Sequence, residues 1–187
     1  MGLAIVPIVL AAFSPFPAQQ SNQRISILGL ASLVVHVPGP HFDERLASQL
    51  PEPTTGISAG TLTIWQEDKV FHSVSFVFRP NTPQPKPAPA SIYSWPDFYA
   101  GVASTTVRCS ADKSVLVAGR AGLRHTETCE SAGFRQVGVR FSVPSGTGLL
   151  EVECSILSGS GQYLDVGQVK ADADAIVSSW KWTSASP

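Results

Sequence analysis

The chain has 187 residues, of which 43% are hydrophobic and only 14% are charged, and its formal net charge at pH 7 is −1. This length is typical of a single domain that buries a sizeable core, and the small charged fraction predicts a surface rich in uncharged polar residues. The Lys and Arg residues are scattered singly along the sequence, which argues against nucleic acid as a partner because nucleic-acid-binding domains carry a basic stripe.

Residues 3–13 form an apolar run that is too short to cross a bilayer, which takes about 20 residues. The run has the length of the apolar part of a signal peptide, although no Lys or Arg precedes it and cleavage after Ser14 or Ala18 would be poor. The polar, proline-broken residues that follow are typical of a linker. We therefore expect residues 1–24 to be a signal-like or anchor segment with its linker. The protein would then be exported to the periplasm or cell envelope, with membrane association through this segment as one option. The alternatives are a buried N-terminal strand in a cytoplasmic protein and a mis-assigned start codon.

Residues 25–78 predict short strands and one short helix. Clusters of β-branched residues over 25–38 indicate one bent strand or two short ones. Apolar residues spaced by four indicate a short helix over 41–50. Alternation of polar and apolar residues over 61–65 and 70–78 predicts a hairpin.

Six prolines fall between residues 79 and 96. Proline cannot donate to a sheet ladder, so we expect residues 79–96 to be an extended surface loop. The segments on either side are too small to fold separately, which makes this loop an insertion within one domain rather than a linker between two. A helical turn is expected to follow at residues 95–102, with Pro96 in its first position.

The second half of the chain predicts an antiparallel sheet closed by a helix. Two short strands and then a meander of three longer ones, joined by Gly-containing turns, are expected at residues 105–108, 115–117, 123–130, 134–143 and 149–157. Residues 166–181 predict an amphipathic helix across the sheet, with a stripe formed by Val169, Ala173, Ile176, Val177 and Trp180. We therefore expect an α+β fold over residues 25–182, with about six antiparallel strands flanked by helices, and a tail at 183–187.

Four segments of the second half resemble the PsbP/Mog1-like α/β/α sandwich superfamily. They are a small-residue turn feeding a strand, the end of the next strand, the strand after it and a closing helix with the sequence I-V-S-S-W-K-W, at residues 117–124, 140–143, 150–156 and 176–182. Residues 34–38 are similar to the first strand of that family, which ends in Pro. The resemblance covers residues 25–182 and implies a sheet flanked by helices. Because most members act by binding, it also implies a non-enzymatic binding or accessory protein.

His125 and Glu127 are the main polar candidates for chemistry. They lie two residues apart on a predicted strand, so both side chains project from one face. A histidine and a carboxylate on one face can bind a metal or relay a proton, whereas a solvent-facing sheet surface explains them without any chemistry. The Gly-rich turns at 145–148 and 159–161 lack the features of a hydrolase elbow or a phosphate cradle. We therefore assign no catalytic residue and expect no cofactor.

The three cysteines, Cys109, Cys129 and Cys154, lack the spacing of a zinc site. In an exported protein two of them can be bridged. We expect the pair Cys109 and Cys129, because both lie at strand ends that lead away from the sheet centre. Buried free thiols are the alternative.

Trp182 and Trp95 are candidates for an exposed aromatic surface that a protein partner would contact, with core packing as the alternative for Trp182. The leading prediction is a non-enzymatic, exported binding or accessory protein of the cell envelope with a protein partner. A metal-binding or hydrolytic domain that uses His125 and Glu127 is the second. A cytoplasmic effector-binding chaperone module is the third.

Overall fold

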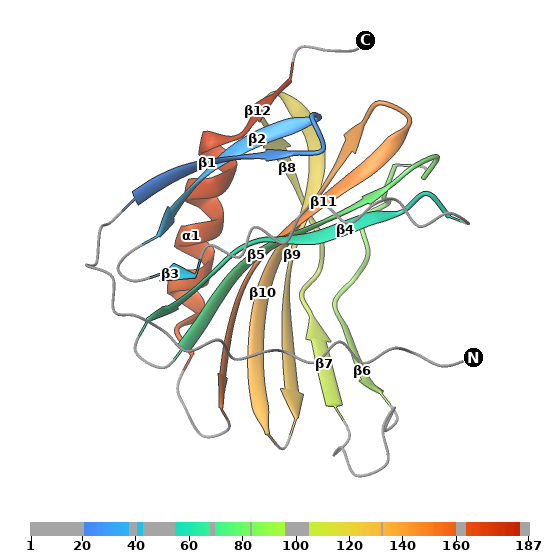
Figure 1. Cartoon of the computed structure of the whole chain (residues 1–187). Helices are drawn as coiled ribbons and strands as arrows, with labels where there is room; N and C mark the ends of the chain where they lie inside the picture. Colours follow the sequence, from blue (N-terminus) through green and yellow to red (C-terminus); the bar gives the residue numbers. More distant parts are fainter. Residues whose placement is uncertain are drawn as a thin grey trace.

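The structure is a computed structural model of the chain, and it describes residues 21–37, 41–42, 55–67, 70–82, 84–95, 105–131, 133–159 and 164–183. These residues form two antiparallel sheets and one helix (Figure 1). Within these ranges, no helix has both the length and the apolar character that a membrane crossing requires.

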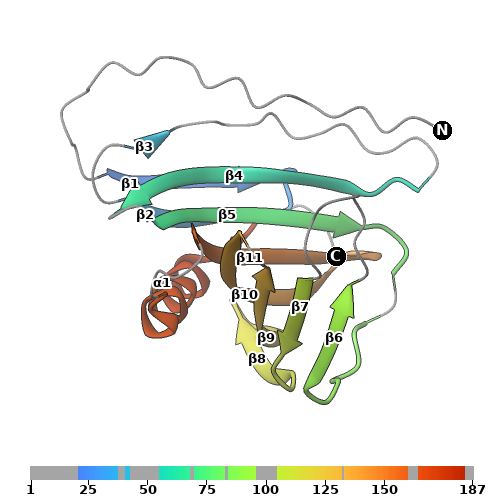
Figure 2. The same ribbon diagram turned by 90° about the horizontal axis from the view of Figure 1, so that it is seen from below.

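The larger sheet has nine strands in the order β3-β4-β5-β11-β10-β9-β7-β6, and β8 pairs with β9 beside β7. The strands are β3 His41–Phe42, β4 Ser58–Glu67, β5 Val70–Arg79, β6 Ser91–Trp95, β7 Thr105–Cys109, β8 Lys113–Val117, β9 Arg120–Ser131, β10 Phe134–Ser145 and β11 Gly148–Gly159. The sheet is strongly twisted, so that β4 and β5 run in a different direction from β6 and β7 (Figure 2).

The smaller sheet joins the first and last described elements. Its order is β1-β2-β12, with strands Ser21–Ile27, Ala31–Val37 and Lys181–Trp182. The helix α1, Val166–Ser179, begins after Asp165, whose carboxylate accepts hydrogen bonds from the backbone N–H groups of Gly167 and Gln168. These bonds satisfy open donors of the first helical turn. The helix ends at Trp180, after which the chain pairs with β2.

One hydrophobic core lies between the larger sheet and a second layer made of α1 and the β1–β2 hairpin. α1 packs against β2, β10 and β11. Leu33 and Ile176 come from the second layer, Phe141 and Val152 come from the larger sheet, and all four are at most 3% exposed. The two sheets and the helix therefore share the same buried interior.

Alternation of side chains gives the larger sheet two faces of opposite character. The helix face lies under α1, and in β10 it carries the buried Val137, Val139, Phe141 and Val143. The opposite face, which we call the polar face, carries in the same strand Gln136, Gly138, Arg140 and Ser142. Opposite the last three in β11 lie Ser155, Glu153 and Glu151.

The predicted α+β fold with flanking helices is wrong, as is the α/β/α arrangement that the family resemblance implies. The described residues hold twelve strands in two sheets and a single helix. His41 and Phe42, where the spacing predicts the start of a helix, are extended because they pair with Trp65 and Ile64 at the edge of β4; residues 43–50 lie outside the described residues. Residues 91–95, predicted as loop, contain no proline and form β6 against β7.

Several predicted elements are confirmed. The hairpin is β4 and β5, and the meander is β9, β10 and β11. The closing helix is α1, with Val169, Ala173 and Ile176 buried as its stripe predicts, although it ends at Ser179 rather than at residue 181. β1 begins at Ser21, within the residues predicted as linker.

Candidate functional site

A pocket of about 550 Å³ lies between β7, β8, β9 and α1. Its described lining combines residues of the helix face with Cys109 and His125, which project from the polar face. Among the described residues that line it, the four cationic ones are Arg108, Lys113, Arg124 and Lys170. Asp174 is the one carboxylate residue in that same described lining, which also includes the hydroxyl residues Ser110, Thr126 and Thr128. Positive charge is therefore in excess, and we call this feature the cationic pocket.

Strand register explains why these cations gather. Arg124, Thr126 and Thr128 alternate along β9 and so share the helix face. Lys113 of β8 lies directly opposite Arg124, and Arg108 of β7 lies directly opposite Thr128. Residues directly opposite each other in an antiparallel pair project from the same face. The register thus places three cations on one side of the sheet.

The helix supplies the other wall of the cationic pocket. Lys170 and Asp174 are four residues apart on α1 and so lie on one side of it. Asp174 Oδ1 accepts a 2.7 Å hydrogen bond from Arg124 Nη1, and the Arg124 guanidinium carbon lies 5.5 Å from the centre of the Phe141 ring. Arg124 is held from two sides and is 22% exposed, whereas the Asp174 side chain is 62% exposed.

Among the residues that the structure describes, the other three cations of the pocket lack such a partner. No ion pair joins Arg108, Lys113 or Lys170 to another residue within the described ranges. Their charges are available to a bound anion.

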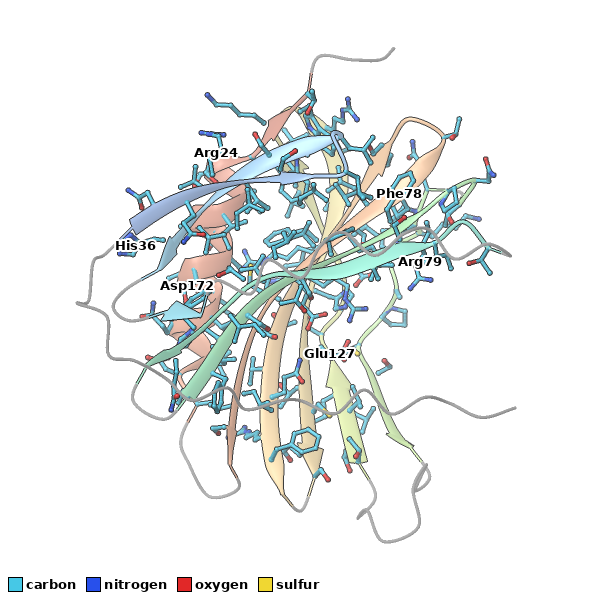
Figure 3. The ribbon with its side chains drawn as sticks, in the orientation of Figure 1. Arg24, His36, Phe78, Arg79, Glu127 and Asp172 are labelled. Atoms are coloured by element: carbon cyan, nitrogen blue, oxygen red, sulfur yellow. The ribbon has the colours of Figure 1, made fainter. Side chains whose placement is uncertain are left out.

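On the polar face, a series of ionisable side chains crosses neighbouring strands. Arg140 Nε and Nη2 donate hydrogen bonds of 2.9 and 2.6 Å to Glu153 Oε2, and Nη2 also lies 3.6 Å from Glu127 Oε2. Figure 3 labels Glu127, which projects from β9 next to β7. Burial lowers the pKa of Arg140, but the charges of Glu153, Glu127 and Glu151 outweigh it, so that this pKa lies above its ordinary value.

Gly138 makes room for the carboxylate that Arg140 binds. A Cβ atom at Gly138 would lie 2.7 Å from Glu153 Oε1. Gln136 Nε2 donates to the same oxygen at 3.4 Å. The absence of a side chain at residue 138 therefore lets Glu153 lie flat against β10.

His125 is oriented by an aspartate from the β7–β8 connection. Its Nδ1 lies 3.1 Å from Asp112 Oδ1, and its Nε2 lies 3.9 Å from Glu127 Oε2. Asp112 also binds Ala88, which belongs to the segment of residues 79–96 that contains six prolines. Its Oδ2 accepts from Ala88 N at 3.1 Å, and its own N–H donates to Ala88 O at 2.9 Å. One carboxylate thus positions both the imidazole ring and a surface segment.

His125 and Glu127 share one face, as the alternation predicts, and they belong to this ionisable network. In the part of the chain that the structure describes, no group of three or more His, Cys, Asp or Glu side chains is arranged to hold a metal ion. A metal between His125 and Glu127 would also lie close to the positive charge of Arg140, which opposes its binding.

The Cys109–Cys129 bridge expected from the sequence is not formed, and both are free thiols, as is Cys154. Cys109 lies opposite Glu127 and Cys129 opposite Val107, so the two cysteines are diagonal neighbours. Such neighbours lie about 7–8 Å apart, whereas bridged Cα atoms lie within about 7 Å. Burial, together with Glu127 and Glu130, raises the pKa of the Cys129 thiol.

Trp182 packs within the fold. Its Nε1 donates to Val117 O at 3.2 Å, and the Arg120 guanidinium carbon lies 4.0 Å from its ring centre. The Trp180 ring is 5.4 Å away. Trp182 therefore joins β12 to the β8–β9 turn, which leaves it half-buried. The backbone of Trp95 pairs with Thr105, and its side chain lies outside what the structure describes.

The cationic pocket escapes prediction from the sequence because its cations lie on four elements whose register is not visible there. The one available signal is the alternation of Arg124, Thr126 and Thr128 along a predicted strand. Arg140 and Glu153 escape for the same reason, since they meet only across the β10–β11 pair.

No protein-family model matches this chain, and no curated protein matches it either.

Proposed function

We propose that this protein is a non-enzymatic binding protein that holds an anionic ligand in the cationic pocket. The observation that carries the proposal is the charge balance of the pocket. Cations from β7, β8, β9 and α1 converge there, and within the described lining only Asp174 opposes them. Three of these cations have no ion pair in the described ranges, so an anion is the ligand that matches them.

The cross-strand pair of Lys113 and Arg124 supports the proposal. Like charges directly opposite each other on neighbouring strands destabilise the sheet, and this pair places two cations in that relation. A bound anion between them converts the repulsion into attraction. The pocket volume of about 550 Å³ also lies in the range of small-molecule sites.

The cellular location is part of the same proposal. The apolar run of residues 3–13 and the polar residues after it suit an exported protein of the cell envelope. N-terminal sequencing of the native protein tests this. A soluble cytoplasmic protein that keeps Met1 would place the binding function in the cytoplasm.

Isothermal titration calorimetry tests the binding function with two anionic probes, sodium tripolyphosphate and a hexaglutamate peptide. The parent protein should bind at least one of them, more tightly at low salt than at high salt. The double substitution Lys113→Gln with Arg124→Gln should weaken binding by about tenfold or more.

The matched control replaces two exposed cations of the smaller sheet, Arg24→Gln with Lys181→Gln, and changes the net charge by the same amount. This control should bind like the parent. If neither probe binds, or if both double variants lose affinity equally, the cationic pocket is not the ligand site.

A second candidate function, acid–base or metal chemistry at His125 and Glu127, is favoured by the contact between Asp112 and His125. A carboxylate on Nδ1 holds the ring with Nε2 free to act, and here Nε2 faces Glu127. Titration of the parent and of His125→Ala with Zn²⁺ tests it. Zn²⁺ binding that His125→Ala abolishes would support this function, and no binding to the parent would eliminate its metal form.

A further inference from the structure

We infer that the ligand of the cationic pocket carries two or more phosphate groups, one of which displaces Asp174 from Arg124. This inference rests on the proposed function. It concerns which anion the pocket selects and how its own carboxylate takes part in that selection.

The cations of the pocket are spread along β9 rather than focused on one point. Lys113 and Arg124 form one end, and Arg108, opposite Thr128, lies four residues further along. At about 3.4 Å per strand residue, this separates the two ends by about 14 Å at the backbone. Two or more anionic groups therefore suit this spread of cations better than a single one.

Hydroxyl donors lie between the two ends. Thr126 and Thr128 lie on the same face of β9, and Ser110 Oγ accepts a hydrogen bond from Thr126 N at 2.8 Å. A hydroxyl that accepts in this way still has its own hydrogen to donate. Phosphate oxygens accept several hydrogen bonds each, so this mixture of cations and hydroxyls suits phosphate groups.

Arg124 and Asp174 decide between phosphate and carboxylate ligands. Arg124 is held against Phe141 and is mostly buried, whereas Asp174 is 62% exposed and can turn into solvent. A monovalent carboxylate would replace Asp174 at Arg124 by a group of the same charge. Because Asp174 is tethered beside Arg124 and the free carboxylate is not, this exchange is not favourable. Both groups can bind a guanidinium through two oxygens, but a terminal phosphate carries more charge and has a third acceptor oxygen, so it can displace Asp174.

Asp174 therefore acts as a built-in competitor for the ligand. Once displaced, its charge still lies beside the bound phosphate and repels it. Removal of that charge should strengthen the binding of a polyphosphate.

The experiment compares three soluble probes by isothermal titration: tripolyphosphate, tricarballylate and a hexaglutamate peptide. The parent should bind tripolyphosphate most tightly. Asp174→Asn should tighten tripolyphosphate binding about fivefold. Asp172→Asn, which removes a charge two residues away on the same helix, is the matched control and should change binding by about twofold at most.

The outcomes separate this inference from the proposed function. If tricarballylate or hexaglutamate binds as tightly as tripolyphosphate, the pocket binds anions but the phosphate class is wrong. If Asp174→Asn leaves tripolyphosphate binding unchanged, or if Asp172→Asn tightens it equally, Asp174 is not a competitor. If no probe binds, the proposed function itself fails.

Arg124→Lys gives a readout that does not depend on removing charge. Lys keeps the positive charge but cannot bind two oxygens in the manner of Arg. The variant should therefore bind tripolyphosphate about fivefold more weakly than the parent. Unchanged tripolyphosphate binding would contradict the role given to Arg124.

The same phosphate chemistry is offered by a soluble compound and by a lipid headgroup. Co-sedimentation with vesicles that contain phosphatidylinositol 4,5-bisphosphate, compared with vesicles of phosphatidylcholine alone, distinguishes the two sources. Binding to the bisphosphate vesicles that excess tripolyphosphate displaces would identify a lipid headgroup as the source. Tripolyphosphate binding without vesicle binding would identify a soluble ligand.

Discussion

Among single residues, Arg140 neutralises carboxylates that strand register brings together on the polar face. Replacing it with Met keeps much of its length but leaves Glu153 and Glu127 without the cation that lies nearest to both. We expect Arg140→Met to lower the free energy of unfolding by about 1–3 kcal/mol, less than for a fully buried pair because Arg140 is a third exposed.

Arg79→Met is the control for Arg140→Met in urea unfolding. The Arg79 side chain pairs with Glu151 at 2.9 Å but is 44% exposed, so its loss should cost at most about 1 kcal/mol. Equal losses in the two variants would show that Arg140 is no more than a surface ion pair.

Gly122 lies where β9 comes close to the backbone of β10. A Cβ atom there would lie 2.8 Å from Ser142 O and 3.1 Å from a methyl group of Val143. Because backbone atoms cannot move aside cheaply, Gly122→Ala should destabilise the protein by about 1–3 kcal/mol in thermal denaturation. Gly159→Ala, where no atom of the described residues lies within 4 Å of the added Cβ, should stay within about 0.5 kcal/mol of the parent. If Gly122→Ala lowers the stability as little as Gly159→Ala does, β9 and β10 are further apart at this position.

Cys154 should be unreactive in the folded protein. It is 3% exposed, and burial, with smaller effects from Asp172 and Glu153, raises its pKa, so the reactive thiolate does not form near neutral pH. Titration with Ellman's reagent at about pH 8 should therefore give the same native thiol count for the parent and for Cys154→Ser. A lower count in the variant would show that Cys154 is accessible. If the protein is unfolded without a reducing agent and only one thiol titrates, two of its three cysteines form a disulfide.

At the level of elements, the end of α1 is the strongest test of the second layer. Trp180 is 3% exposed and closes the core where α1 gives way to β12. Trp180→Ala should cost about 3–5 kcal/mol in urea unfolding. Lys181→Ala, at the adjacent exposed position, should cost at most about 0.5 kcal/mol. If Trp180→Ala and Lys181→Ala lose similar amounts of stability, the Trp180 side chain is not part of the core.

Local patterns predict the elements that depend on near neighbours. Alternation over residues 70–78 and the Gly-containing turns of the meander identify β5, β9, β10 and β11, and the stripe of Val169, Ala173 and Ile176 identifies α1. The errors fall where a distant partner decides the backbone. His41 and Phe42 become a strand because β4 offers them an edge, and Lys181 leaves the helical pattern because Ser32 of β2 pairs with it.

The features of the candidate site also divide into those that local sequence predicts and those that depend on a distant partner. That His125 and Glu127 share a face can be predicted from alternation alone, whereas the contact of Arg124 with Asp174 cannot. It joins β9 to α1 across fifty residues of sequence, and it requires the helix to pack on the neighbouring strands β10 and β11. Charges that meet only through tertiary packing leave no local pattern in the sequence.

For the molecule as a whole, one core shared by two sheets predicts one cooperative transition. Leu33 of the smaller sheet is fully buried in that core, whereas Leu116 on β8 is 73% exposed. Leu33→Ala should lower the free energy of unfolding by about 2–5 kcal/mol, and far-UV circular dichroism and tryptophan fluorescence should report the same midpoint. Leu116→Ala should be close to neutral. Two separate transitions in Leu33→Ala would show that the sheets unfold independently.

The pairing of β12 with β2 also determines when folding can finish. Thr183 N donates to Leu30 O at 3.0 Å, and Val34 N donates to Ser179 Oγ at 2.8 Å, so the first described hairpin is closed by the last described residues. A ribosome synthesises the chain from its N-terminus at about 5–20 residues per second. The β1–β2 hairpin therefore cannot make its contacts with Ser179 and Thr183 until nearly the whole chain has been synthesised. Contacts so distant in sequence require loop closure before they stabilise anything. We therefore expect slow folding that is completed only after synthesis, which would leave the nascent chain open to chaperones and to a translocation channel that accepts unfolded chains.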